Sequence, residues 1–420
     1  MTKIAFFLVS TAPYLLDYYH LGFYKKENSV RLVLCVREGV RAKLSASTLE
    51  LFDAIYDVKR ANIESYNTAL DVSVLKEVIT NELLGGTFEV ARIFTYNEFN
   101  LPVAAELREL FGIEGHQLSD LERFKDKITI KSKLRDNNVR VPLFVQFDSS
   151  QYQADPIKYY QELVNSIGLP FILKPINTSG SFGVLKISSQ EQFVSIGATL
   201  PLSHYVYEAE EYVSGTLYHC DAYFQNGECG QFHCSRYNYP LLEFGEGKNI
   251  GSIPLLQSDP IAKKLFDFHR RIYKILQPPD GITHTEIFIS NKDDKCVFLE
   301  NSLRAGGAYI IPMYERSFGV NLLSIDFSKQ MDFRTYDNYD KKEYCFWASF
   351  PKLFGCVSKL LQPSVESRYS LEWHVVVGEQ LQAAKSMRDK AAAFISWNSD
   401  YDALSNDFDY ISKNSVLETQ

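Results

Sequence analysis

The sequence lacks the features that mark several large classes of protein. Its seven cysteines are an odd number, spread through 420 residues without paired C-x-x-C spacing. A secreted scaffold usually carries an even, disulfide-forming set, so we expect reduced thiols and a cytoplasmic protein. No apolar run approaches the length of a transmembrane helix. The run Ile4–Val9 is too short for a signal peptide, which indicates a first strand and no membrane partner.

An excess of positive charge is also missing. The chain carries 44 basic and 52 acidic side chains, a net charge of −8, which argues against a nucleic-acid partner. No G-x-G-x-x-G follows the first expected strand, so no dinucleotide is assigned. Hydrophobic residues make up 45% and charged residues 23%, as in ordinary globular proteins. A chain of this length is expected to form two or three lobes.

The order of apolar runs predicts an α/β fold. Residues 1–118 alternate strands and helices, as in a Rossmann-like lobe, with these expected elements: strands Ile4–Val9, Val30–Val36 and Ala91–Thr95, and helix Leu101–Phe111. Residues 119–208 predict a helix from Asp120 to Asn138, a strand Val141–Phe147 and a small α+β lid. Residues 209–420 predict a larger lobe with a helix Ser258–Gln277, a mixed or antiparallel sheet and an extension from about residue 331.

The segment Phe171–Ile187 carries the clearest chemical signal. An apolar strand ends at Lys174, and a loop of small residues, Thr178–Gly183, leads into a second strand, Val184–Ile187. Backbone N–H groups in such a loop can hold phosphate oxygens, because Gly and Ser add no bulk. In a Walker A loop the lysine follows the last glycine and opens a helix, so this is a different device. The pattern predicts a flap over a triphosphate, with a plain structural hairpin as the alternative.

Two carboxylates lie downstream in apolar surroundings, Glu286 in HTEIFIS and Glu300 in CVFLENS. A buried glutamate is rare unless it is paired or bound to metal, and Mg²⁺ takes one or two carboxylates. The alternative is an ion pair with Arg304. The turn Ala305-Gly306-Gly307 lets backbone approach a ligand. His284 should face the same side as Glu286, which makes it a substrate candidate, with a core histidine as the alternative.

A zinc site is the other metal hypothesis. The residues His219, Cys220, Cys229, His233 and Cys234 cluster within sixteen positions. Neighbours such as His219 and Cys220 point to opposite faces of a strand, so they cannot both bind one ion. We therefore expect an ordinary strand pair and no stoichiometric zinc.

Together these motifs resemble the ATP-grasp superfamily, and most of all its carboxylate–amine ligase branch, which includes L-amino-acid ligases and natural-product ligases. The resemblance covers about Phe94 to Gly319. It implies a Rossmann-like pre-ATP-grasp lobe, a small lid and a larger C-terminal lobe, with ATP between the last two. Two positions depart from the common pattern, because Leu217 stands where many relatives hold the ribose with a glutamate, and Ser302 where many carry asparagine.

The resemblance also implies a role for each motif. The residues expected to bind ATP are Lys127 and Lys174 at the phosphates, Ser179, Gly180, Ser181, Phe182 and Gly183 in the flap, and Glu210, Glu211, Tyr212 and Val213 at the adenine hinge. Glu286 and Glu300 are expected to bind two Mg²⁺ ions, for which Mn²⁺ can substitute. Arg304 and Lys174 are the expected catalytic residues. The expected substrate-binding residues are His284, Arg304, Gly306 and Gly307.

The implied activity is the ATP-dependent joining of a carboxylic acid or amino acid to an amine. The acid would be activated as an acyl phosphate, with ADP and phosphate released. A free or carrier-protein-bound acid and a homodimer both stay open. The alternatives are a carboxylase of the biotin-carboxylase type and a non-catalytic ATP-binding protein. Retention of Lys174, Glu286, Glu300 and Arg304 argues against the non-catalytic protein.

Overall fold

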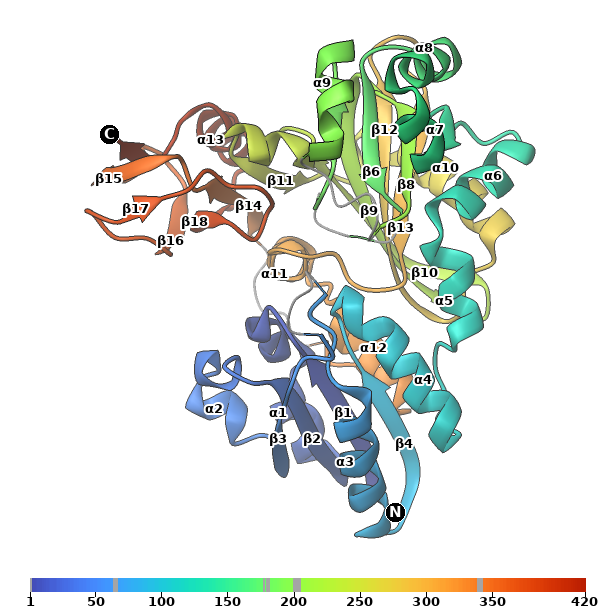
Figure 1. Cartoon of the computed structure of the whole chain (residues 1–420). Helices are drawn as coiled ribbons and strands as arrows, with labels where there is room; N and C mark the ends of the chain where they lie inside the picture. Colours follow the sequence, from blue (N-terminus) through green and yellow to red (C-terminus); the bar gives the residue numbers. More distant parts are fainter. Residues whose placement is uncertain (1, 63–66, 177, 179–181, 199–204, 338–342) are drawn as a thin grey trace.

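The computed structural model describes residues 2–62, 67–176, 178, 182–198, 205–337 and 343–420 (Figure 1). The N-terminal lobe lies at the bottom of the view, the lid and the main C-terminal sheet at the upper right, and the C-terminal extension at the left. Among the described residues, no helix is both long and apolar enough to cross a membrane.

The N-terminal lobe is built on a parallel sheet in the order β3-β2-β1-β4. Each residue of β1 from Ile4 to Val9 is at most 1% exposed, because helices cover both faces of the sheet. The predicted Rossmann-like arrangement is confirmed. Its elements are β1 (Thr2–Val9), α1 (Leu21–Glu27), β2 (Val30–Arg37), α2 (Ala46–Leu49), β3 (Ala54–Val58), α3 (Val72–Leu84), β4 (Phe88–Phe94) and α4 (Leu101–Phe111), with 3-10 turns at Pro13–Tyr19, Arg41–Lys43 and Glu98–Asn100.

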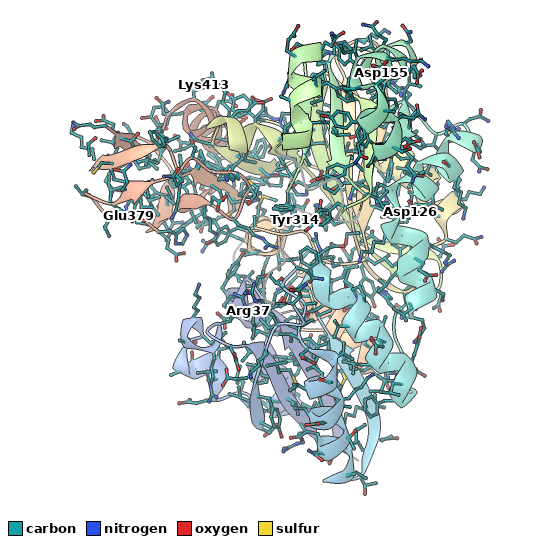
Figure 2. All side chains as sticks on the ribbon, viewed as in Figure 1. Arg37, Asp126, Asp155, Tyr314, Glu379 and Lys413 are labelled. Atoms are coloured by element: carbon teal, nitrogen blue, oxygen red, sulfur yellow. The ribbon has the colours of Figure 1, made fainter. Side chains whose placement is uncertain are left out.

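The predicted helix from Asp120 to Asn138 is wrong, because the structure has two helices there, α5 (Leu118–Lys125) and α6 (Lys127–Asp136). Asp126 interrupts them with a φ of −74° and a ψ of 103°. Its carboxylate accepts hydrogen bonds from the N–H groups of Ile128 and Thr129 at 2.9 and 3.1 Å, as a helix N-cap does. The break, labelled at Asp126 in Figure 2, places Lys127 on the first turn of α6.

The lid is a four-stranded antiparallel sheet in the order β5-β8-β6-β7. Strand β6 pairs with β7, so the predicted hairpin that begins at Lys174 is present. Strand β5 is shorter than the predicted Val141–Phe147. The elements are β5 (Phe144–Gln146), α7 (Ser149–Ala154), α8 (Pro156–Ile167), β6 (Phe171–Pro175), β7 (Leu185–Ile187), α9 (Gln190–Ser195), a 3-10 turn (Ile196–Ala198) and β8 (Tyr207–Glu211).

The C-terminal lobe holds an eight-stranded antiparallel sheet in the order β13-β12-β9-β10-β11-β14-β18-β16. Strand β14, the first strand of the extension, pairs with β11, so the extension continues the same sheet. The main elements are β9 (Gly215–Gln225), β10 (Glu228–Tyr237), a 3-10 turn (Leu241–Glu246), β11 (Ile250–Pro254), α10 (Pro260–Leu276), β12 (Gly281–Ser290), β13 (Cys296–Ser302), α11 (Ile310–Phe318) and α12 (Leu322–Gln330). The extension adds β14 (Tyr344–Pro351), β15 (Gly355–Leu360), β16 (Arg368–Trp373), β17 (Gln380–Leu381), β18 (Lys390–Asn398), α13 (Tyr401–Lys413) and β19 (Leu417–Thr419).

Helix α12 joins the two lobes, because it packs against the sheet of the N-terminal lobe. Phe327 on this helix lies 5.8 Å from the ring of Phe7 and 5.0 Å from that of Phe94. Helix α11 lies between the N-terminal lobe, the main sheet and the extension, and its Tyr314 is near the centre of Figure 2. The N-terminal lobe, the main sheet and the extension therefore meet around α11 and α12.

Candidate active site

Two strand-borne carboxylates face each other at the centre of the site. Glu286 on β12 and Glu300 on β13 are direct partners in the antiparallel register. Side chains in such pairs lie about 4.5–5.5 Å apart at Cβ, and like charges placed there destabilise a sheet. Glu286 is only 5% exposed. The pair is therefore suited to a hard divalent cation such as Mg²⁺, which binds carboxylate oxygens and offsets their repulsion.

Lys127 lies beside one of these carboxylates. Its Nζ is 3.4 Å from Oε2 of Glu300 and donates to the carbonyl of Thr178 at 3.2 Å. Burial would raise the pKa of Glu300, but the charges of Lys127 and Lys174 outweigh it and lower that pKa. Glu300 is therefore ionised at neutral pH, as a metal ligand must be.

Lys174 belongs to a buried cluster of two lysines and two glutamates. Glu210 lies 2.6 Å from Lys174 and 2.8 Å from Lys131, which in turn lies 2.7 Å from Glu208. Burial opposes ionisation, but the two lysines lower the pKa of Glu210 to about 2, and the glutamates raise the pKa of Lys174 above its usual range. Glu210 thus contacts lysines in this structure. Sequence reasoning missed Lys131 and Glu208, although Lys131 follows Lys127 by one helical turn.

An apolar slot of about 110 Å³ runs between the lid and the C-terminal lobe. Its apolar lining includes Ile172, Val184, Leu217, Leu242, Phe288 and Leu299. Glu211, Tyr212 and Val213 also line it, and its charged part is formed by Lys127, Lys174, Glu286 and Glu300. An apolar slot with charges gathered in one part suits a flat ring joined to phosphates. Leu217 packs into this slot, with Phe288 as its strand partner.

The flap prediction is only partly within the described residues. Ser179, Gly180 and Ser181 lie outside them. Phe182 and Gly183 are described, and the carbonyl of Phe182 accepts a 3.1 Å hydrogen bond from Thr178 Oγ1. Gly183 has a φ of +71°, and a Cβ there would lie 3.0 Å from Pro175 Cγ, so the position requires glycine.

A second cavity, of about 160 Å³, shares Lys127, Glu286 and Glu300 with the slot and is also lined by Arg304. The alternative that Arg304 pairs with Glu286 is wrong. Its Nε instead donates to Oε2 of Glu98 at 2.6 Å, and Ser302 donates to the same oxygen at 2.8 Å. Glu98 comes from the N-terminal lobe. Sequence reasoning did not assign it to the site, although it follows the end of β4.

His284 also lines the second cavity, on the same side of β12 as Glu286. Its Nε2 is 3.8 Å from Oε1 of Glu286, and its Nδ1 is 2.7 Å from Oδ1 of Asp221. Burial would lower the pKa of His284, but the Asp221 carboxylate raises it to about 9, so the ring is charged at neutral pH. His219 and Tyr314 contact the other oxygen of Asp221, at 2.6 and 3.0 Å.

The two glycines after Arg304 have different surroundings. A Cβ on Gly306 would lie 2.8 Å from both Asp221 Oδ1 and His284 Nδ1, whereas one on Gly307 would meet nothing within 4 Å. Gly307 lines the second cavity. Gly306 thus lets the turn lie directly over the Asp221–His284 hydrogen bond.

The cysteines considered for a zinc site, which was not expected, lie apart from the candidate site. Cys220 on β9 faces Cys234 on β10 within the apolar core, on the side of the sheet opposite to His219. Within the described part of the chain, one group of three possible ligands comes together: His219, Asp221 and His284, within 4.8 Å of one another. These side chains are already joined by hydrogen bonds.

Comparisons with known proteins show what the chain and its fold are similar to. The chain is similar to an L-arginine-specific L-amino acid ligase of Bacillus subtilis, at 25% identity over 285 residues, 66% of each chain. The match spans just under two thirds of that enzyme's length. Its structure is similar to that of an L-amino acid ligase from Bacillus licheniformis, with a TM-score of 0.71 and 13% identity over 100% of this chain and 99% of the other. The biotin carboxylase domain of a Hydrogenobacter thermophilus 2-oxoglutarate carboxylase, solved with MgADP and bicarbonate, gives a TM-score of 0.64 and 14% identity over 98% and 90%.

No protein-family model matches the chain. The similarities nevertheless confirm the resemblance drawn from the sequence, together with the fold that it implied.

Proposed function

We propose that this chain, which has the ATP-grasp fold, is an ATP-dependent carboxylate–amine ligase. The observation that carries the proposal is the facing pair Glu286 and Glu300, which lines both the apolar slot and the cavity of Arg304. A nucleotide in the slot and a carboxylate beside Arg304 would then meet at this pair.

The proposal assigns a role to each of these side chains. Lys127 and Lys174 attract the triphosphate, and Glu286 and Glu300 hold magnesium. Bound magnesium supplies a Lewis acid that offsets charge on the transferring phosphoryl group. Arg304, fixed by Glu98, holds the substrate carboxylate in line with the terminal phosphorus. An oxygen of the substrate carboxylate forms a bond to the terminal phosphorus of ATP. The bond between that phosphorus and the bridging oxygen breaks, and ADP leaves with this oxygen.

The second half of the reaction forms the amide. The amine nitrogen bonds to the acyl carbon, the carbon–oxygen bond to phosphate then breaks, and the nitrogen loses a proton to solvent. The guanidinium of Arg304 stabilises the negative oxygen of the tetrahedral intermediate. The relatives suggest an amino acid as the activated carboxylate, since one is named for L-arginine and another as an alanine–anticapsin ligase.

The test uses ATP, Mg²⁺ and single acids, with hydroxylamine as the trapping amine. We expect ADP and an acyl hydroxamate in equal amounts with the correct acid. Replacing Arg304 with glutamine should lower turnover at least about 100-fold, as loss of one oxyanion donor does. Arg334→Gln, at an exposed position, is the control and should not change the rate. AMP as the stoichiometric product would contradict the acyl-phosphate route and the residue roles with it.

A biotin-carboxylase type of reaction is the second candidate, since such an enzyme shares the fold at a TM-score of 0.64. The same assay with biotin and bicarbonate in place of the acid distinguishes the two. ADP release that requires both biotin and bicarbonate would favour carboxylation. ADP release that depends neither on an acid nor on biotin and bicarbonate would count against both reactions.

A further inference from the structure

We propose that the cavity beside Arg304 accepts a carboxylic acid whose side chain is uncharged and apolar, and that the C-terminal extension selects it. The inference rests on the proposed function and specifies the substrate of the same site.

The charged side chains that line this cavity already pair with one another or with Asp221. Glu98 pairs with Arg304 at 2.6 Å, Lys127 lies 3.4 Å from Glu300, and His284 lies between Asp221 and Glu286. Within the described lining, no further charged side chain is present. A charged substrate side chain would therefore be buried there without a partner, which is strongly unfavourable.

Besides Thr178, Asn301, Ser302 and Gly307, the rest of the lining is an apolar and aromatic wall. It includes Tyr237, Leu241, Ala308, Ile310, Trp347 and Met387. The ring of Tyr237 lies 4.8 Å from that of His219 and 6.4 Å from that of Trp347, in an edge-to-face arrangement with the latter. Tyr237 therefore lies between His219, which belongs to the hydrogen-bonded network of Asp221, and Trp347, which belongs to the apolar wall. Trp347 is only 1% exposed, so this wall is preformed.

Two residues of this wall, Trp347 and Met387, belong to the C-terminal extension. Trp347 lies on β14, opposite Ser252 of β11, and Met387 lies in the loop before β18. The substrate side chain would therefore contact the extension through Trp347 and Met387.

The test compares amino acids that share the α-ammonium and carboxylate groups, so that only the side chain differs. With ATP, Mg²⁺ and hydroxylamine, leucine, methionine and phenylalanine are compared with arginine, lysine and glutamate. Hydroxylamine serves as the amine in each case, so the assay reports on the carboxylate site alone. We expect kcat/KM to be at least about tenfold higher for the best apolar acid than for any charged acid.

A charge placed in the wall tests the cause. Met387 is half-buried, so Met387→Glu can be accommodated, and it should raise kcat/KM for arginine relative to leucine at least about tenfold. The matched control is Gln382→Glu, which adds the same charge at an exposed position outside the cavity and should leave the ratio unchanged.

The outcomes separate this inference from the proposed function. Turnover that prefers a charged acid, or an unchanged ratio in Met387→Glu, would overturn the inference and leave the ligase activity standing. No ADP or hydroxamate with any acid would overturn the proposed function and this inference with it.

Discussion

At the scale of single residues, the close packing around Gly306 leaves no room for a side chain at this position. An alanine there would place its Cβ 2.7 Å from Ile310 Cδ1 and 2.8 Å from two atoms that share a hydrogen bond. Since neither Asp221 nor His284 can move without breaking that bond, we expect Gly306→Ala to lower the free energy of unfolding by about 1–3 kcal/mol. Denaturant titration measures this, and Gly307→Ala, which meets nothing within 4 Å, should fold as stably as the parent.

The proposed metal site gives a second prediction at this scale. Glu300→Gln keeps the shape of the side chain but removes its charge, and it should fold normally because Glu300 is partly exposed, at 35%. Turnover should fall at least about 100-fold, since metal stabilisation of the phosphoryl group is worth several kcal/mol. ATP binding followed by calorimetry should also become less sensitive to Mg²⁺. A variant with near-parental activity would remove Glu300 from the metal site.

The sequence predicted some residues of the site better than others. Glu286 and Glu300 stand out because a glutamate in an apolar strand requires a partner. Glu98 and Trp347 carry no such mark, since each becomes part of the site only when a lobe distant in sequence packs against Arg304 or Tyr237. Their contacts depend on tertiary packing, which no local pattern encodes.

At the scale of secondary-structure elements, the contact between α6 and β8 depends on buried charges. Lys131 on α6 is fully buried and lies within 2.8 Å of both Glu208 and Glu210. Lys131→Met would leave the two carboxylates with Lys174 alone, and breaking such a network costs about 3–5 kcal/mol. We expect that loss in chemical denaturation. Lys133→Met, at an exposed position of the same helix, is the control, and an equal loss there would contradict the role of the buried charges.

The carboxyl group of Asp326, on helix α12, destabilises the folded protein when it is ionised. Burial raises the pKa of Asp326 from 3.8 to about 6, against the opposing effects of Gln330 and Arg108. The folded state therefore binds a proton more tightly than the unfolded state, and stability should fall as the pH rises from about 4 to 6. The fall is at most about 3 kcal/mol, at 1.36 kcal/mol per pKa unit.

Asp326→Asn should remove this dependence, so that the variant gains stability relative to the parent at pH 7 but not at pH 4. Urea denaturation at both values measures the change. Asp332→Asn, at an exposed position just after α12, should retain the parental slope. An identical slope in Asp326→Asn would show that another group is responsible.

Most elements followed from their sequence patterns. Helix α4 has the predicted bounds, because Gly112 marks its end. The region around Asp126 did not follow, since the apolar spacing continues across it while the aspartate caps a new helix. The apolar periodicity favours one continuous helix there, whereas the hydrogen bonds of the Asp126 cap favour a break, and the structure has the break.

At the scale of the whole molecule, the extension is part of the central sheet and not an appendage. A chain ending at residue 337 would expose the edge of β11 and the apolar residues that contact Trp347 and Phe346. We expect it to aggregate or to lose cooperative unfolding, because an unpaired apolar edge promotes association. Size-exclusion chromatography and thermal denaturation test this. Removal of residues 417–420 alone should leave a folded monomer or oligomer of parental size, and a stable, active 1–337 chain would contradict the argument.

The arrangement of lobes was predictable only in outline. The alternation of strands and helices indicated the parallel sheet of the first lobe, and the resemblance implied the lid. The pairing of β14 with β11 was not predictable, because it joins segments about ninety residues apart through backbone hydrogen bonds, which leave no signature in the side chains.

The placement of Met387 in a loop has a consequence for how such a protein can diversify. The carboxylates and lysines proposed to hold the triphosphate lie on regular strands and helices. Met387 lies between β17 and β18, where exchanges are structurally inexpensive. Under the proposed function, exchanges in that loop would therefore change which acid is accepted and would leave the residues of phosphoryl transfer in place.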